Sequence, residues 1–410
     1  MNSTRVTVVD LGSAKTVCLV AEMSERGKVR VVGSGVEPSK GLRRGAVVDL
    51  DEATRSVREA LKQAHDGGSG EGEHAFVGVG SPLVHGATAR GYVPLYPKSR
   101  QITREDVLQV IKHSRQVSLP PDEEQIQAMP QTFSVDGQNG IQKPIGMSGG
   151  RLEVTTFLVT GQTSHIQNIE RAVTQCGLKV EQMVLQSLAS GLGVLSPEAL
   201  DHGCAVIDLG AGTTDIAVFD KGALTASVSL PVGSQLVTSD LSKLLKTSPD
   251  EAERLKTEFG SVQLEGIPET ETVPVLQLGQ AHTRPLARRV LCEIIQSRVR
   301  EIATMVRQQI EKSGTLGVLP GGVVLTGGGS LLPGIDRLFE ETLNQGPVRI
   351  GRPKDAGFDF AGSDEPGMAS AAGLVRFALQ NFDDEFSPVG GTDDWKDRIR
   401  TFWSLLSGRA

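Results

Sequence analysis

The sequence lacks the patterns that mark several large classes of protein. Its 410 residues include four cysteines (Cys18, Cys176, Cys204 and Cys292), and none has the CxxC spacing of a zinc or redox site. The seven histidines form no HExxH or other paired spacing, which argues against a zinc centre. We therefore interpret the cysteines as small, buried side chains in a reducing compartment.

An excess of positive charge and long apolar runs are also missing. The net charge is −7, so nothing in the charge balance predicts a nucleic-acid partner. No stretch approaches the roughly 18 consecutive apolar residues of a membrane-spanning helix. The opening MNSTRVTVVDLG enters a strand pattern without the apolar core of a secretion signal, so we expect a soluble, cytoplasmic protein.

A repeated strand–turn–strand pattern organises what is present. Val206–Phe219 reads VIDLGAGTTDIAVF, and Val8–Leu19 reads VVDLGSAKTVCL, so each copy has apolar residues, Asp, Leu and Gly in the same order. One such turn is more often an ordinary hairpin than a binding site. Two copies at domain-length separation indicate two similar subdomains that face one ligand.

The chemistry that suits such a turn is the binding of phosphate and metal. Glycines allow successive backbone N–H groups to converge on one anion. An aspartate at the strand end is placed to hold Mg²⁺ directly or through water. The sequence adds hydroxyl groups from Thr213 and Thr214, and a positive charge from Lys15.

A third glycine-rich segment follows later in the chain. Gly321–Asp336 reads GGVVLTGGGSLLPGID, which predicts a strand, a triple-glycine turn and a helix. In isolation the glycines would be read as a flexible linker. Their place between a β-branched strand and an amphipathic helix favours a backbone that passes close to a flat ligand.

The alternation of predicted strands and helices indicates an α/β layer architecture. The sequence pattern changes in Leu83–Gly161, which is predicted to be a small inserted α+β module, either a packing module or an active-site lid. Within it, Thr103 and Asp106 form a variant capping box ahead of an apolar helix face. Helical spacing is found in Asp51–Ala64, Ser164–Cys176, Gln182–Leu195, Gln235–Leu245, Pro249–Phe259, Leu286–Ile310 and Pro366–Leu379.

The last predicted helix, Asp393–Ser407, follows a linker rich in Asp, Gly, Ser and Pro at Gln380–Thr392. Such a helix commonly docks on its own protein. The linker, both tryptophans of the chain on one stripe and flanking cations instead favour a helix that lies in a membrane interface. A single helix binds reversibly, so stable attachment favours self-assembly. The proposed membrane residues are Trp395, Ile399, Phe402, Trp403, Leu405 and Leu406, with Lys396 and Arg398 at the sides.

Together the turns place the chain close to the actin-like ATPase superfamily, and within it the chain closely resembles the FtsA family of bacterial cell-division proteins over nearly its whole length. The final linker and helix correspond to that family's membrane-targeting sequence. The phrases that carry the resemblance are GLRRGAVVDL (Gly41–Leu50), IQAMPQTFSVDGQNGIQKPIGMSGGRLEV (Ile126–Val154), VIDLGAGTTDIAVF, LPVGSQLVTSDL (Leu230–Leu241), DEAERLK (Asp250–Lys256) and LTGGGSLLPGI (Leu325–Ile335).

The resemblance implies an α/β actin-like fold of two duplicated α/β subdomain pairs around an ATP cleft, with an inserted α+β subdomain and a C-terminal amphipathic helix. The expected divisions are subdomain 1A (1–82, and 162–195 with a connecting helix), the inserted subdomain 1C (83–161), subdomain 2A (196–235 and 316–365), subdomain 2B (236–315), a closing helix (366–379), a flexible linker (380–392) and the membrane-targeting helix (393–410).

It also implies a site for ATP and Mg²⁺. The residues that match the first phosphate turn are Asp10, Gly12, Ser13, Ala14 and Lys15, and those of the second are Asp208, Gly210, Ala211, Gly212, Thr213 and Thr214. Asp10 and Asp208 are the metal residues. Gly327, Gly328, Gly329 and Ser330 match the adenosine turn, and Glu253 and Lys256 match a pattern that approaches the nucleoside.

One departure bears on hydrolysis. Many superfamily members, including FtsA proteins, have Glu-Pro-x-Ala before the second turn, where this chain has Gln186-Ser187-Leu188-Ala189. Glutamine at position 186 can orient a water molecule but cannot accept its proton. The expectation is therefore a weak ATPase at most, and primarily a nucleotide-dependent structural protein.

The function implied is a scaffold that polymerises at the cytoplasmic face of the inner membrane at the division septum. Its expected partners are copies of itself, membrane lipid, later division proteins and the acidic C-terminal peptide of FtsZ. Arg284, Arg288 and Arg298 are candidates for that peptide, although surface arginines are commonly only solvated. The alternatives are a small-molecule kinase or phosphatase of the same superfamily, and a PilM-type assembly adaptor.

Overall fold

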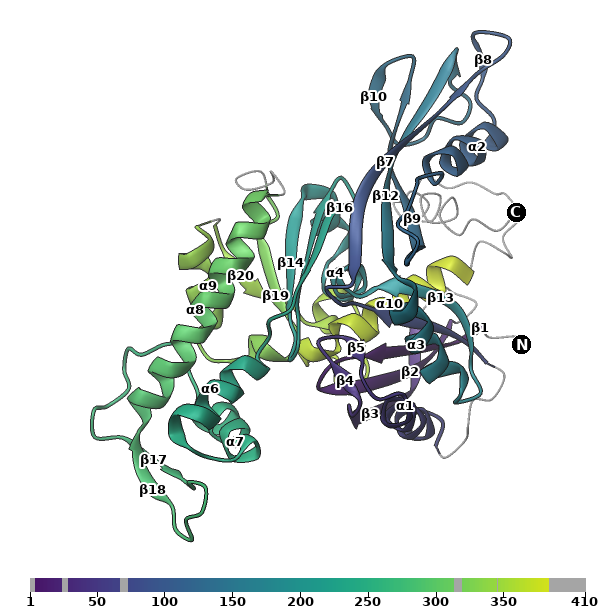
Figure 1. The fold of residues 1–410 in the computed structure, drawn as a ribbon. Helices are drawn as coiled ribbons and strands as arrows, with labels where there is room; N and C mark the ends of the chain where they lie inside the picture. The colour runs from purple at the N-terminus through teal and green to yellow at the C-terminus, as the bar shows by residue number, and fades with distance from the viewer. Residues whose placement is uncertain (1–3, 24–28, 67–72, 313–318, 345, 383–410) are drawn as a thin grey trace.

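The computed structural model describes residues 4–23, 29–66, 73–312, 319–344 and 346–382. Two α/β halves, each built on a five-stranded sheet, lie side by side (Figure 1). The predicted membrane helix at 393–410 and most of the predicted linker lie outside the described residues. None of the helices in the described ranges is long and apolar enough to cross a bilayer.

The two sheets have the same topology. In the first sheet β1 (Thr4–Leu11) is the central strand. On one side β1 pairs antiparallel with β2 (Lys15–Met23), and β2 pairs antiparallel with β3 (Val29–Pro38). On the other side β1 pairs parallel with β6 (His74–Val79), and β6 pairs parallel with β13 (Lys179–Leu185). The strands of the second sheet repeat this arrangement in the same chain order; they are β14 (Cys204–Leu209), β15 (Thr214–Asp220), β16 (Ala223–Leu230), β19 (Val323–Thr326) and β20 (Val348–Ile350). The duplication predicted from the two turns is thus confirmed.

The helices repeat as well. In the first half α1 (Leu50–Ala64) comes after β3 and a short hairpin, α3 (Thr163–Thr174) comes after β6 and a long inserted segment, and α4 (Gln186–Val194) directly follows β13. In the second half α8 (Arg288–Lys312), α9 (Ile335–Leu343) and α10 (Ala369–Phe382) occupy the corresponding places. Each helix buries an apolar face, and in α1 that face includes the predicted Ala53, Val57 and Leu61.

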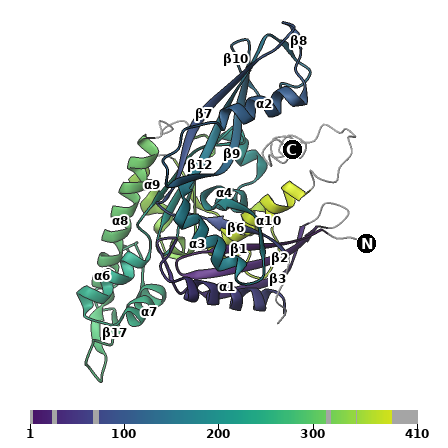
Figure 2. The same cartoon turned by 45° about the vertical axis from the view of Figure 1, so that its right-hand side comes forward.

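The equivalent helices α4 and α10 pack against each other at the centre of the molecule (Figure 2). Their backbones approach so closely that a Cβ on Gly373 would lie 1.6 Å from the carbonyl oxygen of Ala189, and one on Gly193 would lie 1.9 Å from that of Ala369. Glycine is therefore required on both sides of this crossing.

An inserted subdomain extends from the first half at one end of the molecule (Figures 1 and 2). It contains the sheet β10-β9-β12-β7 and helix α2 (Arg104–Ser114), and it has its own apolar core. The predicted capping box at Thr103 and Asp106 is confirmed. Its strands are β7 (Val84–Pro94), β9 (Glu123–Val135), β10 (Gln138–Ile141) and β12 (Arg151–Gln162), with a small pair β8 (Arg100–Gln101) and β11 (Ser148–Gly149) at its tip.

A second addition extends from the other half at the opposite end (Figure 1). It consists of α6 (Gln235–Leu245), α7 (Pro249–Phe259) and a hairpin of β17 (Thr272–Val275) and β18 (Arg284–Ala287). The described residues also form the hairpin β4 (Leu42–Arg43) and β5 (Ala46–Val47), helix α5 (Pro197–His202) and the 3₁₀ turns η1 (Gly328–Leu331), η2 (Pro353–Ala356) and η3 (Pro366–Met368).

Several predicted helix boundaries are wrong by two residues or more; the helix predicted at Ser164–Cys176, for example, ends at Thr174. The helix expected at Gln182–Leu195 begins at Gln186, because the preceding residues pair with β6 as strand β13. The helix expected from Leu286 begins at Arg288, since Arg284–Ala287 pairs with β17. The closing helix runs from Ala369 to Phe382 after a 3₁₀ turn, so the first three residues of the predicted linker are helical. Short apolar runs do not distinguish strand from helix by periodicity, which explains the error at the start of α4.

Candidate functional site

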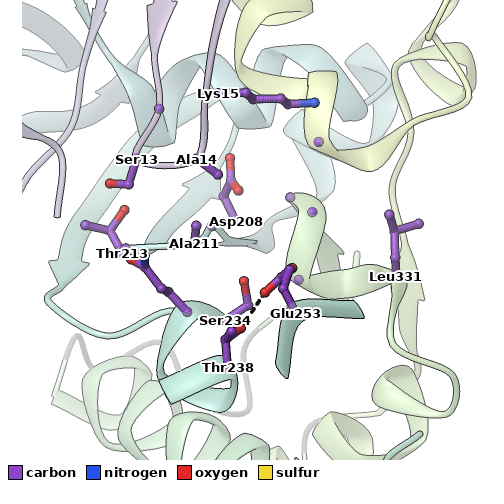
Figure 3. Close-up of a pocket in the computed structure, with 18 of the residues that line it drawn as sticks. Ser13, Ala14, Lys15, Asp208, Ala211, Thr213, Ser234, Thr238, Glu253 and Leu331 are labelled. Atoms are coloured by element: carbon purple, nitrogen blue, oxygen red, sulfur yellow. Dashed lines mark hydrogen bonds between the residues drawn. The ribbon is translucent and has the colours of Figure 1, made fainter. Parts of the chain in front are cut away.

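A cavity of about 690 Å³ lies between the two halves (Figure 3). This volume is in the range of sites that bind nucleotides and other small ligands. Most of the residues predicted to bind nucleotide line it; they are Asp10, Gly12, Ser13, Ala14, Lys15, Asp208, Gly210, Ala211, Gly212, Thr213, Glu253, Lys256, Gly327, Gly328 and Gly329. Gln186, predicted to orient a water molecule, also lines the cavity.

The two acidic turns enter this cavity with the same geometry. The N–H of Gly12 donates to the carbonyl oxygen of Lys15 at 3.1 Å, and that of Gly210 donates to the carbonyl oxygen of Thr213 at 3.0 Å. The turns also touch each other, since a Cβ on Gly212 would lie 2.5 Å from Ser13 Oγ. The duplicated turns thus meet at one end of the cavity, where their backbones face the same space.

The triple-glycine turn closes another wall. Gly327 has a φ of +82°, and a Cβ there would lie 2.2 Å from Asp208 Oδ1. A side chain is therefore excluded at Gly327 both by backbone conformation and by space. Gly328 has open space around its Cβ position, which leaves the backbone accessible from the cavity.

Three aspartates lie in the cavity wall, and each accepts a hydrogen bond from a neutral side chain. Gln186 Nε2 donates to Asp10 Oδ1, Ser190 Oγ donates to Asp208 Oδ2 at 2.5 Å, and Thr213 Oγ1 donates to Asp215 Oδ2 at 2.9 Å. None of these partners carries charge.

Burial raises the pKa values of these carboxyl groups. The pKa of Asp208 rises to about 7, that of Asp215 rises to about 6, and that of Asp10 is also raised. The hydrogen bonds from Gln186 and Ser190, and the charge of Lys15, oppose this effect without cancelling it. Five acidic side chains and two lysines line the cavity, so a bound cation would improve its charge balance.

The residues fit Mg²⁺ better than a tightly coordinated transition metal. No three His, Cys, Asp or Glu side chains in the described part of the chain converge closely enough to form a metal site. Mg²⁺ is commonly held by only one or two carboxylates, with water and phosphate oxygens completing the shell. Asp10 and Asp208, near the ends of β1 and β14, are the carboxylates that would hold such an ion.

At the far end of the cavity, α6 and α7 contribute a polar cluster. Glu253 Oε2 accepts hydrogen bonds from Lys256 Nζ at 2.7 Å and from Thr238 Oγ1 at 2.5 Å, the latter drawn in Figure 3. Lys256 is 7 % exposed, so its charge is held largely inside the protein. Leu331, which follows the glycine turn, adds an apolar side chain to the cavity wall at a neighbouring edge (Figure 3).

Two predicted residues are placed outside the cavity lining. The Thr214 hydroxyl donates to the carbonyl oxygen of Val232 at 2.8 Å, because Thr214 is the first residue of β15 and its side chain is directed away from Thr213. Ser330 Oγ donates to the carbonyl oxygen of Gly327 at 2.7 Å and so stabilises the glycine turn without lining the cavity. Both side chains are buried.

Several lining residues were missed by sequence reasoning. Asp215 directly follows the two threonines, so the sequence TTD was the available signal for it. Ser234 and Thr238 come from the start of α6, and Ser370 comes from α10. Their positions depend on how distant elements pack, which no local pattern predicts.

The three candidate partner arginines lie in the second addition and on α8. Arg298 Nε is 2.5 Å from Asp240 Oδ2, and Arg288 Nη1 is 2.9 Å from Glu271 Oε1. Arg284 is exposed and donates to the neutral Gln277 Oε1 at 2.9 Å. Arg284 therefore keeps more of its charge for a partner than the other two.

Solved structures share this fold at low sequence identity. A chain of the PilM-PilN type IV pilus biogenesis complex is 15% identical, with a TM-score of 0.66 over 91% of this chain and 98% of that one. MreB5 of Spiroplasma citri bound to ADP is 14% identical, with a TM-score of 0.58 over 92% of this chain and 98% of that one. These similarities establish an actin-like fold.

Sequence comparison is more specific. A family model described as Cell division protein FtsA matches residues 205–373, and one described as SHS2 domain inserted in FTSA matches residues 83–160. Cell division protein FtsA of Neisseria meningitidis is 36% identical over 378 residues, which cover 92% of this chain and 90% of that protein. The Bacillus subtilis protein of the same name is 34% identical over 382 residues, with 93% and 85% covered. The kinase, phosphatase and PilM-type alternatives are not favoured, and the chain belongs to the FtsA family of cell-division proteins.

Proposed function

We propose that this protein is an ATP- and Mg²⁺-dependent scaffold that polymerises on the cytoplasmic face of the inner membrane during cell division. The observation that carries the proposal is the cavity enclosed by two duplicated acidic turns. The fold is shared with MreB5 structures bound to ADP and to AMPPNP, which supports a nucleotide as the ligand.

In this proposal the backbone N–H groups of the two turns and Lys15 hold the phosphates. Asp10 and Asp208 hold Mg²⁺, which when bound neutralises the phosphate oxygens. The glycine turn passes along the nucleoside, while Glu253 and Lys256 face it from α7.

Slow turnover is part of the proposal. Gln186 occupies the place of a general base, and an amide cannot take a proton from water. Its Nε2 is already engaged by Asp10, which leaves hydrolysis without an obvious proton acceptor at this position. Nucleotide would then act chiefly as a switch for assembly.

The remaining parts of the proposal follow family membership. The inserted subdomain, assigned as 1C, would make contacts between subunits, and the final helix would attach the polymer to lipid. The hairpin β17–β18 and α8, in subdomain 2B, would bind the C-terminal peptide of FtsZ. Exposed Arg284, with Leu278 at 67 % exposure on the same hairpin loop, offers both charge and apolar surface for such a peptide.

Calorimetric titration with ATP tests the nucleotide site. We expect one-site binding that is strengthened by Mg²⁺ and weakened at least tenfold by Asp208→Asn, because the variant loses a metal-holding carboxylate. Asp220→Asn, at the exposed end of β15, is the matched control. If ATP gave no binding, or if the two variants behaved alike, the proposed site would be wrong.

A further inference from the structure

Helix α4 lies between the two halves and contributes polar side chains to both of them. It is buried on nearly all sides, although it carries Gln186, Ser187 and Ser190 in its first five residues. Buried polar side chains are retained where they have hydrogen-bond partners. What these three side chains bond to therefore indicates what the helix does.

Gln186 and Ser190 are one helical turn apart and lie on the same face of α4. Gln186 donates to Asp10, the next-to-last residue of β1 in the first half. Ser190 donates to Asp208, the next-to-last residue of the equivalent strand β14 in the second half. A single helix thus holds the corresponding aspartates of both duplicated units.

The surroundings of Gln186 are shaped for this contact. A Cβ on Gly80 would lie 2.2 Å from Gln186 Oε1, and a Cβ on Gly78 would lie 3.2 Å from both Gln186 Cγ and Asp10 Oδ1. Two glycines of the β6 end therefore leave the room that the amide needs beside the aspartate. A glutamate here would present a carboxylate, which cannot donate a hydrogen bond to Asp10.

We infer that Gln186 and Ser190 are positioning residues that orient Asp10 and Asp208 for one shared divalent cation. This inference rests on the proposed function, because it assumes that Mg²⁺ and nucleotide occupy the cavity. Residues that orient metal-holding groups commonly affect metal affinity by 10–100-fold when they are removed. Gln186 then fixes an aspartate instead of a water molecule.

Ser187 provides a control on the same helix. Its Oγ is 2.8 Å from Ser227 Oγ on β16, so it also joins α4 to the second half, through a hydrogen bond that involves neither aspartate. Ser187→Ala and Ser190→Ala remove the same atom from adjacent turns of one buried helix. A purely structural role would give the two variants similar properties.

The experiment measures the affinity of a fluorescent ATP analogue for the full chain, once with Mg²⁺ and once with EDTA. Ser190→Ala and Gln186→Ala should each weaken binding about tenfold or more in Mg²⁺, with less than a twofold change in EDTA. Ser187→Ala should stay within twofold of the unaltered chain in both. Gln186 lines the cavity, so its truncation tests the inference even if Ser190→Ala fails to fold.

The possible failures can be told apart. If the unaltered chain binds the analogue, but the Ser190 and Gln186 variants match Ser187→Ala, the inference is overturned while the proposed function stands. Equal losses with Mg²⁺ and with EDTA would also overturn it, because they indicate a general effect on the cleft. If the unaltered chain shows no binding, both the inference and the proposed function fail.

Discussion

At the scale of single residues, Asp106 shows how one carboxylate stabilises the inserted subdomain. It accepts two hydrogen bonds of 2.6 Å from the Arg100 guanidinium and one of 2.9 Å from the N–H of Thr103. These donors lower the pKa of Asp106 from 3.8 to about 2, and the hydrogen bonds from Arg100 have the largest effect. Asp106 is 7 % exposed, so the surrounding water screens the pair only partly.

The sign of this shift gives a prediction. Because the pKa is lower in the folded state, Asp106 stabilises the fold above pH 4, and that contribution is lost as the pH falls through about 2. Asp106→Asn should lower the free energy of unfolding by about 2 kcal/mol at pH 7. Denaturant titrations should show the difference from the unaltered chain shrinking between pH 4 and pH 2, and a constant difference would contradict the account.

Single residues also show what the sequence could predict. Each Asp-Leu-Gly turn was predictable, because a tight turn after an apolar strand leaves few conformations for its residues. The side-chain directions of Thr214 and Ser330 could not be predicted, because they depend on where β15 begins and on how the glycine turn folds back. The donors Ser190 and Thr238 were missed for the same reason, because tertiary packing places them.

At the scale of elements, the crossing of α4 and α10 joins the two halves. Only glycine allows the close approach at Gly193 and Gly373. Both helices are rich in Ala, Ser and Gly, as QSLASGLGV and ASAAGLVRFALQNF show. That the two helices are equivalent in the duplicated fold and pack against each other became clear only from the topology.

This crossing can be tested directly. Gly373→Ala would place a methyl group on the carbonyl oxygen of Ala189, so we expect a loss of about 3 kcal/mol or more in the free energy of unfolding. Gly328→Ala, where nothing lies within 4 Å of the added Cβ, should change it by about 0.5 kcal/mol or less. Similar values for the two variants in urea titrations would show that the crossing is not tight.

At the scale of the whole molecule, the two duplicated halves carry different additions. One extends at the far end of the first half, and the other extends from the second half in the opposite direction (Figure 1). The duplication and the insertion were both predicted from sequence, because they appear as a repeated motif and as a change in composition. The strand order of the inserted sheet was not predictable, since it depends on pairing between distant segments.

In the proposed function the two additions belong to a subunit that would act as a nucleotide switch and as a tether. The cavity lies between the halves, so under the proposed function a bound nucleotide would contact both of them and bias their relative position. The additions at either end would carry that change to neighbouring subunits and to FtsZ. The membrane helix proposed at 393–410 would hold the assembly at the lipid surface.

Co-sedimentation with anionic liposomes tests this account most directly. The full chain is compared with a chain that ends at Thr392, each with Mg-ATP, without nucleotide and with the C-terminal peptide of FtsZ. We predict that the full chain carries the peptide into the lipid pellet and pellets most strongly with Mg-ATP, while the shortened chain stays in solution but still binds ATP. Undiminished pelleting of the shortened chain, or pelleting that does not respond to Mg-ATP, would contradict a nucleotide-dependent membrane scaffold.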